Sequence, residues 1–253
     1  MSEQASPGNV LRVLLENVGG VYVCRKDANG KRIGPLVGYA GKYDAGGAMK
    51  SWVGEVYYNF AMVERWPVIL GEFARNLAES ISGRLGENMV DCCLGMPMGG
   101  VALAFELARR TGARFAFAEK KVTAAATETA REQSDLVLDR HLIEPGQGVA
   151  LVEDVCNNFS TVGKAVGRVE EKGASVIAVV CAINRAMDPT ETGTVVHDYS
   201  DGTGFCIPVI SALDVPTAQF HQDDPFVAAD VAADNIVWKP KDRWDHLQAL
   251  MHA

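Results

Sequence analysis

Gly148-Val-Ala-Leu-Val-Glu-Asp-Val-Cys-Asn-Asn-Phe-Ser-Thr-Val-Gly163 is the stretch of this chain that best predicts its fold. It opens with an apolar run, Val149 to Val152, which ends in two adjacent carboxylates, Glu153 and Asp154. A short polar segment follows, and apolar residues then recur at helical spacing. An unbroken apolar run of this length, followed by a helix, is typical of a buried parallel strand. The stretch therefore predicts a strand, an acidic strand end, a polar loop and a helix.

The polar loop in this stretch predicts a site for an anion. It consists of Asn157, Asn158, Phe159, Ser160 and Thr161. The first amides of a helix are unpaired and its macrodipole is positive at that end, so helix N-termini attract phosphate. Two carboxylates just before such a loop suit a polyol or a magnesium-bound sugar. One short segment could thus hold both ends of a phosphorylated ribose.

Length and composition indicate an ordinary globular protein. The 253 residues suffice for one large α/β domain, or for a domain with a subdomain. Thirty-two acidic and 24 basic residues give a net charge of −8, whereas a general nucleic-acid binder relies on a basic face. The five histidines show no metal-ligand spacing, and the six cysteines form no C-x-x-C pair. We expect no nucleic-acid partner and no metal held by a side-chain cluster.

The sequence also predicts where the protein works. Its start has neither a basic segment nor an apolar core, so it does not resemble a signal peptide. No apolar run approaches the length needed to span a membrane. Cys92, Cys93 and Cys181 lie in apolar runs and are predicted to be buried free thiols. We therefore expect a cytoplasmic protein without a membrane partner.

The pattern along the chain predicts three regions. Residues 1–66 carry short β-like runs rich in glycine and tyrosine, which favours a small mixed subdomain. Residues 67–215 alternate apolar strands with helices, which predicts a Rossmann-like α/β core whose parallel sheet is flanked by helices. Residues 216–253 form a tail with a closing helix.

The α/β region divides into elements that can be compared with the structure. Residues 119–135 are polar and predict either a surface helix or a mobile loop, and residues 186–202 a polar loop or hairpin. The other expected elements are helices over 67–85, 101–111 and 244–251, and strands over 89–94, 113–117, 135–139, 174–183 and 205–210.

Three loops are expected to converge at one edge of the predicted sheet. Ligands of open parallel sheets bind outside the carboxyl ends of the strands. Gly95-Met-Pro-Met-Gly-Gly100 allows close backbone approach, so that amides can face a diphosphate. Lys120 and Lys121 supply cations after another strand, and the third loop follows Glu153 and Asp154. Together they predict a site for a sugar that carries a monophosphate and a diphosphate.

These motifs resemble those of the type I phosphoribosyltransferases, and most closely those of the orotate phosphoribosyltransferases. The resemblance covers about residues 32 to 185. It includes the acid pair after an apolar strand, the pyrophosphate loop, the lysine entry to a mobile loop, the orotate-branch hood and an Asp-Arg-like pair. The stretches that carry it are Val152-Glu-Asp-Val-Cys156, Gly95-Met-Pro-Met-Gly-Gly100, Glu119-Lys-Lys121, Lys50-Ser51 with Tyr57-Tyr58-Asn59, and Asn184-Arg185.

The resemblance implies a fold and an activity. Residues 1–66 would form a hood over the α/β core and bind the base. The reaction would transfer a phosphoribosyl group from phosphoribosyl diphosphate to a nucleobase, most closely orotate in pyrimidine biosynthesis, and release pyrophosphate. Mg2+ would be bound through the ligand, and the family often works as a homodimer.

The resemblance also implies roles for particular residues. Glu153 and Asp154 would hold the ribose hydroxyls, and Asn157 to Thr161 the 5′-phosphate. A lysine, Lys120 or Lys121, would neutralise the leaving group. The remaining implied ligand contacts are Met98, Gly99 and Gly100 near pyrophosphate, and Lys50, Tyr57, Tyr58 and Arg185 near an anionic base.

This chain departs from the family pattern at several places. Asn157, Asn158 and Phe159 stand where the family has threonines and glycine, and Phe159 replaces a glycine that can reach positive φ. Trp52-Val-Gly-Glu55 replaces the serine-rich turn of the hood, and Glu119 replaces an arginine. An alternative function therefore stays open, namely a catalytically inactive nucleotide-binding or regulatory protein with the same fold.

Overall fold

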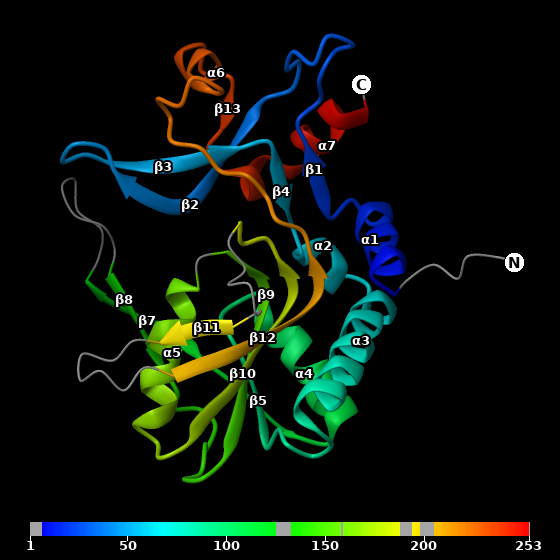
Figure 1. The fold of residues 1–253 in the computed structure, drawn as a ribbon, viewed down its shortest axis with the longest axis vertical. Coiled ribbons are helices and arrows are strands. Elements are labelled where there is room, and N and C mark those ends of the chain that lie inside the picture. The colour runs from blue at the N-terminus through cyan, green and yellow to red at the C-terminus, as the bar shows by residue number, and fades with distance from the viewer. Residues whose placement is uncertain (1–6, 125–132, 158, 188–193, 198–204, 253) are drawn as a thin grey trace, which may run out of the picture. The chain divides into compact units, whose positions relative to one another are not determined.

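A computed structural model describes residues 7–124, 133–157, 159–187, 194–197 and 205–252 (Figure 1). The chain divides into two compact units. The core unit contains Val63–Pro216 and residues up to Arg12, and the second unit contains Val13–Met62 and Thr217–Ala253. The residues expected to form a separate C-terminal tail thus belong to the same unit as the N-terminal segment. The helices α1 (Pro7–Asn17) and α2 (Ala61–Glu64) contain two of the three junctions, and the third lies between Pro216 and Thr217.

A six-stranded sheet forms the centre of the core unit. Five strands are parallel in the order β12-β10-β9-β5-β6, and β11 pairs antiparallel with β12 at one edge. The bounds are β5 (Cys92–Gly95), β6 (Arg114–Phe117), β9 (Gly148–Cys156), β10 (Ser175–Asn184), β11 (Thr194–His197) and β12 (Phe205–Asp214). Most apolar residues of β9 and β10 are buried because the sheet is covered on both faces.

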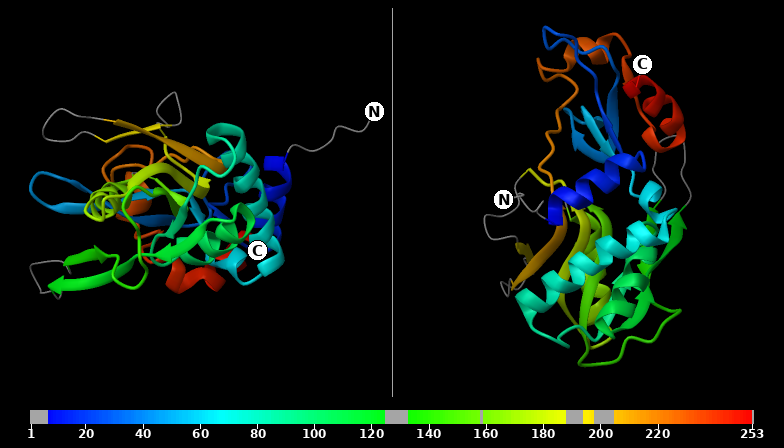
Figure 2. Two further views of the ribbon diagram at one scale, coloured as in Figure 1. Left: turned by 90° about the horizontal axis from the view of Figure 1, so that it is seen from below. Right: turned by 90° about the vertical axis from the view of Figure 1, so that its right-hand side faces the viewer.

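Three helices cover this sheet. α3 (Pro67–Leu85) and α4 (Gly100–Thr111) lie side by side on one face, and α5 (Ser160–Glu170) lies on the other (Figures 1 and 2). Each helix buries an apolar stripe at three- and four-residue spacing, such as Leu70, Phe73, Leu77 and Ile81 on α3. Burying side chains of this size contributes about 1.5–3 kcal/mol each.

The order of the strands indicates where a ligand would be expected to bind. From β5 the chain crosses through α4 to β6, and from β9 it crosses through α5 to β10 in the opposite direction. The order therefore reverses between β5 and β9. In open α/β sheets, ligands bind beyond the carboxyl ends of the strands at such a switch point. The loops after β5 and β9 contain Gly95–Gly100 and Asn157–Phe159.

The structure confirms the α/β prediction and corrects several elements. The helix predicted over 67–85 has the same bounds in the structure, and the parallel sheet lies between helices as expected. The described residues of this segment, 119–124 and 133–137, however, form neither a helix nor a simple loop. They form a hairpin of β7 (Glu119–Ala124) and β8 (Gln133–Val137), and the strand expected over 135–139 is part of β8. Residues 125–132 lie outside the described residues.

The second unit is built from both ends of the chain. Its three-stranded sheet has the order β13-β2-β3, from β13 (Ile236–Val237), β2 (Leu36–Asp44) and β3 (Met49–Gly54). β1 (Val21–Val23) pairs with β4 (Val56–Tyr58). Three short helices complete the unit, namely α6 (Ala228–Ala232), η1 (Pro240–Arg243) and α7 (Trp244–His252). Sequence periodicity did not predict β13, because two residues give too short a pattern.

Arg32 connects three segments of the second unit. Its guanidinium bonds to Glu55 at 2.6 Å, to Asp230 at 3.0 Å and to the Phe226 carbonyl at 2.7 Å. The guanidinium carbon also lies 4.1 Å from the centre of the Phe226 ring. The Arg32 side chain is only 10% exposed. Its positive charge is therefore largely shielded from water, and removing it would take that charge away from its carboxylate partners.

We expect Arg32→Ala to lower the free energy of unfolding by about 3 kcal/mol, because it removes the shielded guanidinium from two carboxylates. Among the described residues, this change leaves Asp230 without an ion pair, while Glu55 keeps only Lys26. Arg75→Ala is the matched control, since Arg75 also pairs with two carboxylates, Glu72 and Glu79, but on an exposed helix face. Urea denaturation of both variants checks this prediction. If Arg32→Ala and Arg75→Ala lowered the free energy of unfolding by the same amount, the prediction would be wrong.

Candidate functional site

The acid pair lies at the carboxyl end of β9, next to the switch point. Glu153 and Asp154 are partly buried, whereas Val149 to Val152 are fully buried. β9 lies between β5 and β10, and Glu153 pairs with Cys181 of β10. β5 ends opposite Val152, whereas β10 continues alongside Glu153, so the acid pair extends beyond β5 and is flanked by β10 on its other side. Its two carboxylates are held on a strand rather than on a mobile loop.

The glycine loop after β5 lies directly against the acid pair. A Cβ atom added to Gly99 would lie 2.1 Å from Oδ2 of Asp154, and one added to Gly100 would lie 2.0 Å from the Val152 carbonyl oxygen. Real Cβ atoms do not approach other atoms so closely. The amide of Met96 also donates to the Val152 carbonyl at 2.8 Å. Glycine is needed here because the Asp154 carboxylate and the β9 backbone occupy the space that a side chain would fill.

The carboxyl of Glu153 is strongly perturbed. Its pKa is raised from 4.5 to about 8, mainly by burial and further by the neighbouring Asp154 carboxylate. The charge of Lys120 and the amide of Asp154, which donates to the Glu153 carboxylate, act in the opposite direction. Glu153 is therefore largely protonated at neutral pH in the free protein. Perturbed carboxyls of this kind gather at functional sites.

The loop between β9 and α5 has the backbone conformation that the family glycine was expected to provide. Phe159 has φ 54° and ψ 15°, in the left-handed region. Its ring packs against the core cluster of the unit, which offsets the cost of about 1–2 kcal/mol for a non-glycine residue there. Phe159 therefore adopts the left-handed conformation at the start of α5 although it is not a glycine.

The other residues predicted for the phosphate loop are described to different extents. Asn157 is partly buried at the end of β9, and Asn158 lies outside the described residues. Ser160 and Thr161 are the first two residues of α5, so their backbone amides lie in its first turn; their side chains are not among those described. The backbone is suited to an anion, and the side-chain contacts remain a prediction.

Lys120 and Lys121 lie on β7 of the hairpin that follows β6. Both are exposed, and they pair with Leu136 and Asp135 of β8. The positive charge of Lys120 opposes the upward shift of the Glu153 pKa, which burial mainly causes. The structure thus brings Lys120 electrostatically close to Glu153. A role for Lys121 remains a prediction.

The Asn184-Arg185 pair ends β10. The Asn184 side chain donates to Asp214 at 3.0 Å and accepts from the Ala186 amide at 3.2 Å, and the Arg185 amide donates to the Cys156 carbonyl at 2.9 Å. Asp214 also accepts from Ser211 at 2.7 Å. This network fixes the backbone that carries Arg185. The prediction from sequence did not include Asp214, because a strand-end aspartate gives no signal without its partner.

The residues predicted to contact the base lie in the second unit. Lys50 is an exposed residue of β3, and Tyr57 and Tyr58 lie on β4. Tyr57 packs against the core of this unit, with its ring centre 6.0 Å from that of Trp244. Of the two neighbouring tyrosines, Tyr57 is thus the one that packs against the core. Tyr58 is partly buried and pairs with Val21 of β1.

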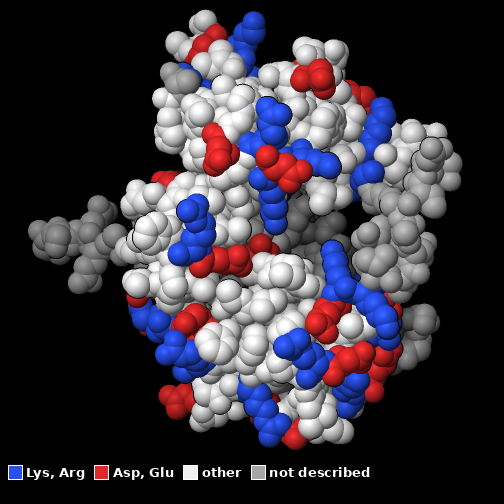
Figure 3. All heavy atoms as spheres, turned by 180° about the vertical axis from the view of Figure 1, so that it is seen from behind, with Lys and Arg blue, Asp and Glu red and all other residues white. Residues whose placement is uncertain are grey.

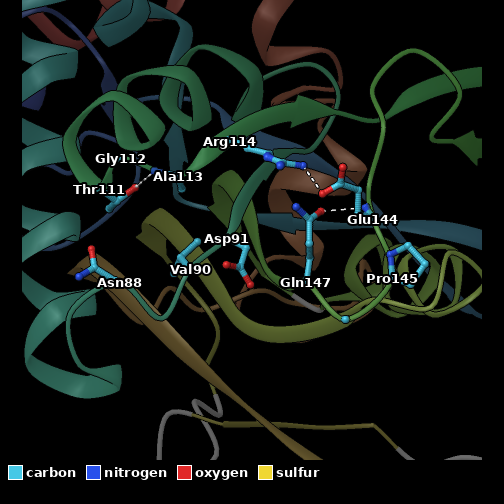
Figure 4. A pocket seen from close by; sticks show the side chains of 11 residues that line it. Asn88, Val90, Asp91, Thr111, Gly112, Ala113, Arg114, Glu144, Pro145 and Gln147 are labelled. Carbon is cyan, nitrogen blue, oxygen red and sulfur yellow. Dashed lines mark hydrogen bonds and ion pairs between the residues drawn. The ribbon is translucent and has the colours of Figure 1, made fainter.

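A polar hollow of about 530 Å3 lies at the opposite, amino end of the sheet in the core unit (Figure 4). Its polar groups already support the surrounding turns. Arg114 pairs with Glu144, the Gln147 side chain accepts from the Glu144 amide at 2.9 Å, and Asp91 accepts from the Gly148 amide at 2.7 Å. The carboxyl end, with its perturbed Glu153, is the better candidate site.

Fold and site together define an α/β protein whose glycine loop and acid pair meet at the switch point of a parallel sheet. A family model described as "Phosphoribosyl transferase domain" matches residues 60–220, more than half of the chain. The chain belongs to this family, which confirms the resemblance found in the sequence.

Curated relatives agree with the family. An orotate phosphoribosyltransferase of Caldanaerobacter subterraneus subsp. tengcongensis is 31% identical over 133 residues, which cover 52% of this chain and 62% of that protein. One from Desulforamulus reducens is 26% identical over 138 residues, covering 54% and 64%. The chain thus matches less than two thirds of the length of these relatives.

Solved structures support the fold. Orotate phosphoribosyltransferase from Aeropyrum pernix aligns with a TM-score of 0.51 at 15% identity, over 81% of this chain and 93% of that one. Leishmania donovani UMP synthase aligns with a TM-score of 0.50 at 14% identity, over 91% of this chain and 42% of that one. At such identities, the likeness concerns the fold alone.

On the face shown in Figure 3, basic and acidic side chains are interspersed, and no continuous basic stripe crosses its described residues. Within the part of the chain that the structure describes, no helix has the length and apolarity needed to cross a membrane.

Proposed function

We propose that this protein transfers the phosphoribosyl group of phosphoribosyl diphosphate to a nucleobase and releases pyrophosphate. The observation that carries the proposal is the contact between the glycine loop and the acid pair at the switch point, together with family membership. A donor bound there has its ribose hydroxyls at the carboxylates. Its 5′-phosphate lies at the start of α5, and its diphosphate lies along the amides of the glycine loop.

The proposed reaction is a displacement at the anomeric carbon of the ribose. A bond forms between that carbon and a ring nitrogen of the base, which gives up its proton to solvent, and the bond to the diphosphate oxygen breaks with its electron pair leaving on pyrophosphate. Glu153 and Asp154 position the sugar, and their negative charge favours the oxocarbenium character of the transition state. Lys120 is proposed to balance charge that develops on pyrophosphate.

The arrangement also fits a magnesium ion that binds together with phosphoribosyl diphosphate. Mg2+ binds through one or two carboxylates together with substrate phosphates and keeps several waters. Glu153 and Asp154 offer oxygen ligands of this kind, while no group of three or more His, Cys, Asp or Glu residues gathers among the described residues. When bound, the ion would neutralise diphosphate charge.

Orotate is the base that we propose. The curated relatives are named orotate phosphoribosyltransferases, and Lys50 in the second unit provides a cation for a carboxylated ring. Arg185 is proposed as a second contact to an anionic base. A homodimer is also proposed from the family resemblance, and light scattering of the purified chain checks it.

We expect donor binding at pH 7 to release a proton from Glu153. The pKa of this carboxyl is about 8 in the free protein, and binding to ribose and Mg2+ favours the charged form. Release should shrink at pH 9, where the free carboxyl is already ionised. Because the folded-state pKa lies above the unfolded value of 4.5, Glu153 also makes the free protein less stable as pH rises from 4.5 to 8.

Calorimetry in buffers of different ionisation enthalpy measures this proton release. Glu153→Gln provides the control, because an amide has no proton to lose in this range. Donor binding at pH 7 with the same proton balance in the wild type and Glu153→Gln would contradict the role of Glu153.

A spectroscopic assay tests the proposed activity. Phosphoribosyl diphosphate and Mg2+ are supplied with orotate, uracil, adenine, guanine or hypoxanthine, while calorimetry measures donor binding separately. Turnover of orotate supports the proposal in full, and turnover of another base replaces only the proposed acceptor. Donor binding without turnover of any base would support the alternative of an inactive binding or regulatory protein, which the altered residues Asn157 to Phe159 keep open.

A further inference from the structure

Three aromatic side chains of the second unit form a cluster that the sequence did not predict. The rings of Tyr43 and His221 are stacked, with centres 3.9 Å apart and planes at 8°. Trp52 lies against both, with its ring centre 5.0 Å from that of Tyr43 and 4.4 Å from that of His221. Tyr43 and Trp52 are half-buried, whereas His221 is exposed. Tyr43 and Trp52 are therefore packed into the unit, whereas the imidazole of His221 is accessible to solvent.

The C-terminal segment that carries His221 is tied to the β2–β3 hairpin. Phe220 and Val53 exchange two backbone hydrogen bonds, of 3.1 and 2.8 Å. The amide of Gln222 donates to the Tyr43 hydroxyl at 2.7 Å, and its side chain donates to the Ser51 carbonyl at 2.9 Å. These bonds on either side of His221 fix its backbone. The position of His221 in the stack is therefore fixed by hydrogen bonds to the β2–β3 hairpin.

An exposed cation, Lys50, shares the face of this cluster. Lys50 is the direct cross-strand partner of Tyr43 and lies two residues before Trp52 on β3. Directly paired residues, and residues two apart on one strand, point to the same face of a sheet. Lys50, Trp52 and Tyr43 therefore share one face. Lys42 pairs with Ser51 and lies on the opposite face of the same hairpin.

We propose that Tyr43, Trp52, His221 and Lys50 form a binding platform for a planar heteroaromatic ring that carries a carboxylate. An aromatic surface stacks with any flat base, and an ammonium group placed beside it selects a ring with a negative charge. The identity of the ring as the acceptor, orotate, rests on the proposed function. The existence of the platform does not, because it can be measured by binding alone.

Position in the chain explains why His221 escaped prediction. It lies 171 residues after Lys50, in a segment without regular periodicity, and only the hydrogen bonds around Phe220 and Gln222 bring it to the hairpin. The platform assigns stacking to Tyr43, Trp52 and His221, whereas sequence reasoning had considered the tyrosines at 57 and 58.

Calorimetric titration of the full-length protein with orotate and with uracil tests the platform. We expect orotate to bind more tightly than uracil, and Lys50→Gln to remove that preference. Lys42→Gln, a lysine-to-glutamine change on the other face, should leave both affinities unchanged. His221→Ala should weaken both ligands about tenfold through lost stacking, and His221→Phe, which keeps a ring, should restore most of that loss.

The outcomes separate this inference from the proposed activity. Lys50-dependent orotate binding without turnover would uphold the platform and remove the activity. Orotate turnover whose KM is unchanged by Lys50→Gln and His221→Ala would overturn the platform and keep the activity. Failure of the full-length protein to bind either ring would also overturn the platform. A similar effect of Lys42→Gln and Lys50→Gln would do the same, because the assignment depends on the face of the sheet.

Discussion

Asp154→Asn is expected to reduce phosphoribosyl transfer at least about a hundredfold while the protein stays folded. The substitution keeps the shape of the side chain but removes a charge that the proposed mechanism places beside the ribose. Glu153→Gln should have a similar effect. Since Glu153 is largely protonated in the free protein, its charge is recruited only when ligand binds. Steady-state kinetics with varied donor concentration measures both losses.

Asp91→Asn is the matched control for these variants. Asp91 lies beside the same sheet but just before β5, at the amino end, and accepts a hydrogen bond from the Gly148 amide that an asparagine oxygen can also accept. The turnover of Asp91→Asn should equal that of the wild type. The midpoint temperature of thermal unfolding should be close to the wild-type value for all three variants. If Asp154→Asn retained wild-type turnover, the acid pair would have no part in the chemistry.

The core unit could be predicted from sequence because its signals are local. An unbroken apolar run can only be a buried segment, and alternation with amphipathic helices leaves few arrangements other than a covered parallel sheet. Once the strands are parallel, the loops after Gly95 and Cys156 must emerge at the same edge. The meeting of the glycine loop with the acid pair therefore follows from the order of elements, and the structure confirms that they touch.

Residues 119–137 and the second unit were harder to predict for a physical reason. The hairpin of β7 and β8 is polar and short, so its strands lack the apolar alternation that usually marks a strand. In the second unit, Val53 bonds to Phe220 and Leu36 pairs with Ile236. Pairing between segments so distant in sequence leaves no trace in local periodicity, and the C-terminal residues were expected to be a separate tail.

Phe159 shows how a residue can contradict a motif without contradicting the structure. A family glycine at this position suggests that only glycine can adopt the turn before α5. The phenylalanine adopts it nevertheless, and its ring packs against the core that includes Val162 and Val166. Partial burial of the aromatic ring offsets the cost of the left-handed backbone conformation. The sequence reveals the substitution, but only the packing reveals that it is tolerated.

Gly99→Ala is expected to weaken donor binding at least about a hundredfold, by moving the groups that hold the ligand rather than by removing one. Gly99 has φ −67° and ψ −27°, a conformation that alanine adopts freely, so the backbone itself is not strained. The new methyl group, however, would lie 2.1 Å from the Asp154 carboxylate. Either the carboxylate rotates away or the glycine loop shifts, and both changes separate the proposed ribose and diphosphate sites.

Gly167→Ala provides the control for this steric effect. Gly167 lies within α5, and a Cβ added there would meet no atom within 4 Å. Alanine favours a helix by about 1 kcal/mol over glycine, so this variant should be slightly more stable and bind the donor as the wild type does. Calorimetry with phosphoribosyl diphosphate and Mg2+ compares the two. Normal binding by Gly99→Ala would show that the contact between loop and acid pair is not needed to hold the donor, and the ribose would then have to bind elsewhere.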